Sequence, residues 1–184
     1  MRSVVNSTFA TLDGIINHME GWHFSAIDDD MDTLTLEQLE ASDAMLMGRR
    51  TYEAYAAAWP TRTGAYPDRI NALPKYVATT TLTAPEWANT TVIDRDLVGR
   101  VREMKAQDGG DILTHGFGPV AKTLLREGLL DELHLWFHPA FAGVGDAGDR
   151  LFDPGLTVGL THTGTRELKS GVVVLSYRAG NQSR

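Results

Sequence analysis

A chain of 184 residues with 42% hydrophobic and 22% charged residues is long enough for one soluble domain with a continuous core. It contains no cysteine, which excludes disulfides and thiolate chemistry, and its net charge of −7 without a block of Lys or Arg argues against nucleic acid as a partner. No apolar stretch approaches the roughly 20 residues that span a bilayer, and no secretory signal begins the chain, so we expect a cytoplasmic protein without a membrane partner.

The chain is predicted to alternate between apolar strands and helices. β-Branched and apolar runs bounded by turn residues predict the strands, which cover residues 4–9, 44–47, 75–80, 90–93, 112–113, 133–137, 157–167 and 171–177. Capping residues, apolar stripes and glycine or proline stops predict the helices, which cover residues 34–42, 51–58, about 94–106 and 119–127. The stretches 60–74 and 143–148 are rich in glycine or proline and predict irregular loops.

This alternation predicts an α/β fold with a mostly parallel central sheet and helices on both faces. The last two strands, 157–167 and 171–177, follow each other without a helix and therefore predict an antiparallel hairpin at one edge. We expect residues 1–180 to form a single domain and residues 181–184 to form a disordered tail.

Two glycine turns are the most informative local feature, because each is expected where a buried strand runs into a helix. Gly48-Arg49-Arg50-Thr51 follows the first of these strands, and His115-Gly116-Phe117-Gly118 follows the second. Glycine lets a ligand approach the backbone, and the start of a helix presents unpaired N–H groups to an anion. Arginines at a helix start oppose the helix dipole unless an anion is bound there. The two turns therefore predict a site for a phosphate-rich nucleotide cofactor.

Several segments of the chain resemble one known family. Residues 7–14 (STFATLDG), 47–53 (MGRRTYE), 110–116 (GDILTHG) and 171–177 (GVVVLSY) occur in the order and approximate spacing of the dihydrofolate reductase-like fold. Within that fold the chain is most similar to the reductase domain of the riboflavin-biosynthesis deaminase/reductase and its stand-alone relatives. The resemblance extends from about residue 2 to residue 178.

The resemblance implies NADPH as hydride donor and indicates which residues bind it. Gly48 and Thr51 would meet the pyrophosphate, and the planar guanidinium of Arg49 would pair with the 2′-phosphate of the adenosine ribose. The complete set of expected cofactor-binding residues is Gly48, Arg49, Arg50, Thr51, Thr79, Thr80, His115, Gly116, Phe117 and Gly118.

The substrate is expected to bind beside the nicotinamide. The resemblance places Asp13 on the loop that covers the nicotinamide and Trp22 near the substrate, and Asp28 follows as a candidate catalytic acid. Asp28 and its acidic neighbours also fit a helix N-terminus, so both interpretations stay open. Tyr55, one helical turn beyond Thr51, is expected to line the substrate site. No metal site is expected, because the histidines lack carboxylate partners at ligand spacing.

The sequence thus predicts an NADP-dependent oxidoreductase that transfers a hydride to a small heterocycle or a ribosylamino-pyrimidine-like substrate. The alternatives are a nucleotide-binding or regulatory module without turnover, a dihydrofolate reductase, and a purely structural dimer built through the last strands. A homodimer is expected from the resemblance and from the apolar residues Trp136 and Phe141, which are predicted to be exposed.

Overall fold

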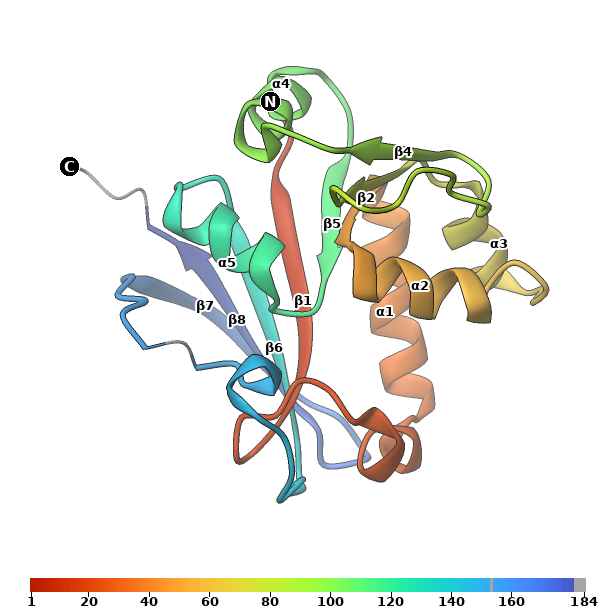
Figure 1. Cartoon of the computed structure of the whole chain (residues 1–184). Helices are drawn as coiled ribbons and strands as arrows, with labels where there is room; N and C mark the ends of the chain where they lie inside the picture. Colours follow the sequence, from red (N-terminus) through yellow and green to blue (C-terminus); the bar gives the residue numbers. More distant parts are fainter. Residues whose placement is uncertain (153, 181–184) are drawn as a thin grey trace.

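In the computed structural model, which describes residues 1–152 and 154–180, eight strands form one sheet in the order β4-β3-β2-β5-β1-β6-β8-β7 (Figure 1). The strands are β1 (Val4–Thr11), β2 (Ser42–Gly48), β3 (Lys75–Ala78), β4 (Thr90–Ile93), β5 (Asp111–His115), β6 (Glu132–His138), β7 (Leu160–Glu167) and β8 (Val173–Ala179). The helices are α1 (Asp29–Ala41), α2 (Arg49–Ala58), α3 (Ala65–Ala72), α4 (Leu97–Ala106) and α5 (Pro119–Arg126), with short 3₁₀ turns η1 (Met19–Gly21), η2 (Phe24–Ala26) and η3 (Ala147–Asp149).

The sheet is parallel from β4 to β6 and antiparallel at the edge formed by β8 and β7. This arrangement confirms the predicted fold class. The change of direction follows from the connections, because helices join most of the parallel strands whereas only residues 168–172 separate β7 from β8.

Neighbouring residues of the strands point to opposite faces, and each face is covered by its own helices. Val4 belongs to a core cluster that includes residues of α4 and α5, whereas Val5 packs with residues of α1, α2 and α3. Figure 1 shows α5 and α1 on opposite sides of the central strands. Helices on both faces are therefore confirmed.

Two helices differ from the sequence prediction. Helix α1 begins at Asp29 rather than at residue 34, because the Asp28 side chain accepts a hydrogen bond from the Met31 amide (2.8 Å) and caps the helix. Helix α3 lies inside the stretch 60–74, so the prediction of a loop there is wrong. Pro67 is tolerated because it stands in the first turn, where helical N–H groups have no intrahelical acceptor.

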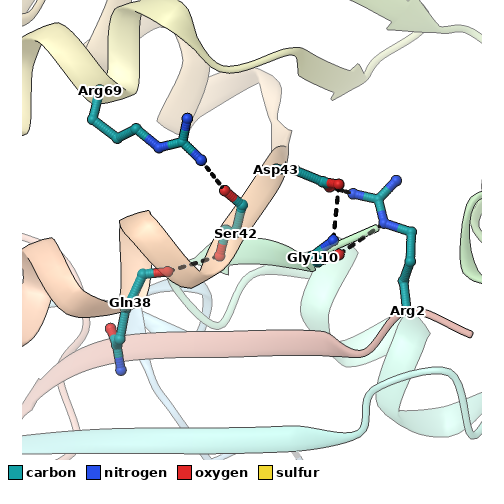
Figure 2. Close-up of polar contacts among 6 residues, drawn as sticks. All are labelled: Arg2, Gln38, Ser42, Asp43, Arg69 and Gly110. Carbon is teal, nitrogen blue, oxygen red and sulfur yellow. Dashed lines mark hydrogen bonds and ion pairs between the residues drawn. The ribbon is translucent and has the colours of Figure 1, made fainter. Parts of the chain in front are cut away.

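The amino ends of the central strands are tied together by side chains (Figure 2). The Arg2 guanidinium pairs with Asp43 and donates from Nε to the Gly110 carbonyl (2.9 Å), while the Gly110 amide donates to Asp43 (2.9 Å). A Cβ at Gly110 would lie 2.7 Å from the Ala41 carbonyl oxygen, so only glycine fits there. Because these contacts occupy the amino ends of β1, β2 and β5, we expect a ligand to bind at the opposite edge of the sheet.

Of the two aromatic residues predicted to be exposed, only one lies at the surface. Trp136 is only 1% exposed, so the prediction that it is exposed is wrong, whereas Phe141 is 74% exposed. The homodimer stays a prediction.

In the part of the chain that the structure describes, no helix has the length and apolar character needed to cross a membrane. The predicted tail at 181–184 lies outside the described residues.

Candidate cofactor and substrate site

The two glycine turns lie beside each other at the carboxyl edge of the sheet. Strands β2 and β5 are parallel neighbours whose register pairs Leu46 with Thr114, so Gly48 and Gly116 follow at the same level. Helix α2 begins directly after Gly48, and α5 begins directly after Gly118. In open α/β sheets this edge, beyond the carboxyl ends of the strands, is where ligands bind.

The backbone at both turns is accessible. Gly48 and Gly118 are the N-cap residues of α2 and α5, and neither helix start receives a side-chain cap from the described residues. A Cβ at Gly116 or Gly118 would meet no described atom within 4 Å, and one at Gly48 would meet only Val120 Cγ2, at 3.5 Å. Gly116 has a φ of 75°, which favours glycine. Both helix starts can therefore present backbone amides to an anion, although in α5 the first residue, Pro119, has no N–H to contribute.

Arg49 is held across this edge by two neighbours. Its Nε donates to Glu53 (2.7 Å), and its Nη1 donates to the Thr81 hydroxyl in the loop after β3. The Thr79 hydroxyl accepts from the amides of Thr81 (3.2 Å) and Leu82 (3.3 Å) and so fixes that loop. Thr81 is absent from the sequence prediction, which names Thr79 and Thr80, yet it is the threonine of this loop whose hydroxyl bonds the guanidinium.

The remaining predicted residues of the first turn are less constrained. Thr80 and Arg50 are exposed, and Arg50 makes no hydrogen bond or ion pair with any described residue. Thr51 is half-buried in the first turn of α2. These side chains are available to a ligand at the start of α2.

Asn6 fixes the second turn and is a residue that the sequence prediction misses. It is fully buried, and its Nδ2 donates to the Thr114 hydroxyl (2.7 Å) and to the Gly116 carbonyl (2.9 Å). The Gly116 amide donates to the Ser7 carbonyl (3.1 Å). Strand β1 therefore sets the shape of the turn after β5. An amide side chain in a strand predicted to be buried is the signal that could have found it, because a buried polar group needs a partner.

His115 and Tyr55 form one hydrogen-bonded pair, although the sequence prediction assigns the first to the cofactor and the second to the substrate. The Tyr55 hydroxyl lies 2.7 Å from His115 Nδ1. Burial lowers the pKa of His115 to about 4 and raises the pKa of the Tyr55 phenol, so both are neutral at pH 7. The Phe117 side chain packs in the core, which leaves only its backbone for a ligand.

The two candidate catalytic carboxylates are held by backbone amides. Asp13 accepts from the Thr11 hydroxyl and from the amides of Gly143 (2.9 Å) and Ala142 (3.1 Å), and these bonds, led by the one from Thr11, lower its pKa to about 2. Asp13 thereby joins the loop after β1 to the loop after β6, two loops that gather at the same end of the sheet in Figure 1.

Asp28 is the N-cap of α1 and also accepts from the Ser170 amide (2.7 Å). The hydrogen bond from the Met31 amide is the main cause that lowers its pKa. Of the two interpretations left open for Asp28, the geometry favours helix capping, and its role as a catalytic acid stays a prediction.

An aromatic cluster lies at the carboxyl ends of β1 and β6. Trp22 is buried and donates from Nε1 to the Asn17 carbonyl (3.1 Å), so its ring acts mainly in packing. Next to it, His23 stacks on Phe9 with ring centres 4.4 Å apart and lies with Nδ1 3.0 Å from His138 Nε2. Among the residues described, no three His, Cys, Asp or Glu side chains are placed to hold a metal ion.

The strand order, the mixed sheet and the two turns at one edge define a dihydrofolate reductase-like fold. The chain belongs to the RibD C-terminal domain family, whose model matches residues 2–174. Membership of this family implies an oxidoreductase.

Relatives cover the chain almost completely. It is 27% identical over 184 residues to the uncharacterized protein YyaP of Bacillus subtilis (strain 168), in an alignment that covers 96% of this chain and 94% of that protein. A putative riboflavin biosynthesis protein from Shewanella sp. PV-4 has a TM-score of 0.76 at 21% identity, with 98% of this chain and 99% of that chain covered. A diaminohydroxyphosphoribosylaminopyrimidine deaminase/5-amino-6-(5-phosphoribosylamino)uracil reductase from Thermotoga maritima has a TM-score of 0.67 at 16% identity. The alignment covers 97% of this chain and 57% of that chain.

Proposed function

We propose that this chain is an NADPH-dependent reductase that transfers a hydride to a C=N or C=O carbon of a small heterocycle, such as a ribosylamino-pyrimidine. The observation that carries the proposal is the pair of adjacent helix starts after β2 and β5, which have no side-chain caps from the described residues and lie at one edge of the sheet. Family membership supports the same class of reaction.

The residues at this edge fit the cofactor. Backbone amides at Gly48 and Gly118 would hold the pyrophosphate, with the Thr51 hydroxyl beside them. Arg49, together with Thr79 and Thr80, would hold the 2′-phosphate, because a guanidinium already placed by Glu53 and Thr81 binds a phosphate with little loss of side-chain freedom.

Bound NADPH supplies the hydride, and the chain supplies position and a dry environment. Asn6 and Ser7 hold the Gly116 turn in place beside β1, which limits where the nicotinamide can lie. The neutral pair of Tyr55 and His115 lines the end of β5 without introducing charge. Asp13 and Asp28 carry no proton at neutral pH, so water is the expected proton source for the heteroatom of the acceptor.

The proposal predicts that the chain binds NADPH more tightly than NADH and that Arg49→Ala removes most of this preference. Loss of a charge-assisted bond to phosphate weakens NADPH by ~2 kcal/mol, roughly thirtyfold, and leaves NADH nearly unchanged. Fluorescence titration measures both constants. Arg102→Ala, which removes an exposed arginine on α4 that pairs with Glu127, is the matched control and should change neither. Equal affinity of the unaltered chain for both nucleotides would refute the role of Arg49.

A nucleotide-binding module without turnover is the second candidate, and the absence of a protonated carboxyl among Asp13 and Asp28 favours it over a dihydrofolate reductase. Stopped-flow absorbance of bound NADPH against a panel of heterocycles separates the two candidates. Oxidation by at least one compound supports the reductase, whereas tight binding of NADPH without oxidation by any of them supports the module.

A further inference from the structure

Two buried histidines form a chain of hydrogen bonds that starts at a backbone carbonyl. His138, the last residue of β6, is fully buried, and its Nδ1 lies 3.1 Å from the carbonyl oxygen of Trp136. Its Nε2 lies 3.0 Å from Nδ1 of His23, which is 8% exposed. The chain of contacts therefore runs from the interior of the sheet outward to His23.

The carbonyl fixes the tautomer of both rings. A carbonyl oxygen only accepts, so His138 must carry its proton on Nδ1, and the neutral ring then has a bare Nε2. A bare Nε2 accepts, so His23 must donate to it from Nδ1. Neutral His23 is therefore left with an unprotonated Nε2, which forms no hydrogen bond to any described residue.

The surroundings keep this nitrogen neutral. Burial, together with the nearby His138, lowers the pKa of His23 to about 4. The rings that contact His23 are those of Phe9, Trp22, Phe24 and His138. No carboxylate, lysine or arginine among the described residues makes a hydrogen bond or ion pair with His23.

His23 also lies at the functional edge of the sheet. Its ring stacks on Phe9, which is partly exposed, whereas the other residues of β1 are buried. Phe9 stands two residues beyond Ser7, whose carbonyl accepts from the Gly116 amide of the cofactor turn. A flat ligand beside Phe9 would therefore lie at the same end of β1 as the turn that is assigned to the nicotinamide.

We propose that Nε2 of His23 accepts a hydrogen bond from a ring N–H of the hydride acceptor, so that the site selects heterocycles with a lactam or imide N–H over their N-alkylated forms. This inference rests on the proposed reductase function and narrows its substrate class. His23 Nε2 is not among the buried polar atoms that lack a partner, so water can reach it in the free protein. The physical basis is that a ligand beside Phe9 would cover this nitrogen: a ligand N–H replaces the lost hydrogen bond from water, whereas an N-methyl group leaves the acceptor unpaired.

The tautomers are tested first, because that measurement needs neither ligand nor turnover. Two-bond ¹H–¹⁵N correlation spectra of the unaltered chain at pH 7 should show both His23 and His138 protonated on Nδ1, each with a pyridine-type Nε2. A proton on Nε2 of His23 would overturn the proposal, whether or not NADPH binds.

The substrate class is tested with pteridine-2,4-dione, a flat heterocycle with two ring N–H groups, and its 1,3-dimethyl derivative, which has none. In the presence of NADP⁺ the unaltered chain should bind the first compound about tenfold more tightly. His23→Phe keeps an aromatic ring on Phe9 but removes the nitrogen, so the ratio of the two dissociation constants should fall to near one. His162→Phe, an exposed position on β7, should preserve the ratio.

The comparison separates this role from a purely structural one, because a distorted site would weaken both compounds alike and keep their ratio. An unchanged ratio in His23→Phe would overturn the proposal. If the unaltered chain oxidises NADPH with some acceptor yet does not distinguish the two compounds, only this inference fails. If it binds no NADPH, the proposed function fails, and the tautomer spectra still decide the state of His23.

Discussion

Buried, neutral imidazoles are the most unusual individual residues near the candidate site. His23 and His115 both have a pKa of about 4, and in each case burial is the main cause. A nitrogen kept unprotonated at neutral pH accepts hydrogen bonds reliably, which suits recognition better than proton donation. Hydride transfer to an uncharged ring would benefit from such an environment, because it excludes water and mobile charge.

The lowered pKa values predict that acid destabilises the fold. At pH 5 the unfolded chain binds a proton on a histidine of pKa near 6.5, whereas folded His23 and His115 do not, so acid favours unfolding. Between pH 6.5 and pH 4 each such histidine contributes a slope of up to about 1.4 kcal/mol per pH unit.

Urea unfolding at several pH values measures this slope. His23→Phe should make the dependence shallower over that window, and His162→Phe should not. A free energy of unfolding that stays constant from pH 6.5 to pH 5 would show that these histidines are not kept neutral by the fold.

For individual residues, the sequence predicts roles that depend on neighbours in the chain, but it does not predict roles that depend on partners far away in the chain. Gly48 and Gly116 could be predicted because a glycine between a buried strand and a helix typically marks a turn that needs its backbone freedom. The roles of Asn6 and His23 could not, because their partners lie on β5 and β6 or the turn that follows, more than 100 residues away. Asp28 is ambiguous in the sequence for a related reason: the same carboxylate suits a cap or an acid, and only the bonds from the Met31 and Ser170 amides decide.

Among the secondary-structure elements, α3 shows how a helix can form in a stretch that predicts a loop. The amine of Lys75, a fully buried residue, donates to the carbonyls of Leu73 (2.7 Å), Asn71 (2.9 Å) and Ile70 (3.2 Å) at the end of the helix. The ammonium also lies 4.4 Å from the centre of the Trp87 ring. Composition alone could not predict α3, because its C-terminal carbonyls are capped by Lys75 of the following strand, whose ammonium lies over the ring of Trp87.

The cap predicts that Lys75→Met destabilises the protein. Methionine has a similar length but removes the donor from the buried bonds to Leu73 and Ile70 and from the partly buried bond to Asn71, which costs roughly 2 kcal/mol in the free energy of unfolding. Chemical denaturation with circular dichroism measures the change. Lys169→Met, which removes an exposed amine from the surface pair with Asp30, should leave the stability nearly unchanged. An equal effect of both substitutions would contradict the capping role.

The whole molecule has two unlike ends. The amino edge of the central strands is closed by Arg2, Asp43 and Gly110, while the carboxyl edge carries two helix starts without side-chain caps from the described residues. Alternating strands and helices predict the parallel sheet and its antiparallel edge. In the sheet, β5 lies between β2 and β1, although these strands are far apart in sequence. Hydrophobic periodicity therefore cannot predict the strand order, and only the resemblance to a known fold does.

The central claim is that one dinucleotide is held by both turns at once, and backbone amide spectra during a titration with NADP⁺ test it most directly. The account predicts that the amides of residues 48–51 and 116–118 shift together along a single binding curve, because the two turns lie side by side on β2 and β5. Shifts confined to one turn, or to residues at the amino edge such as Gly110, would contradict it.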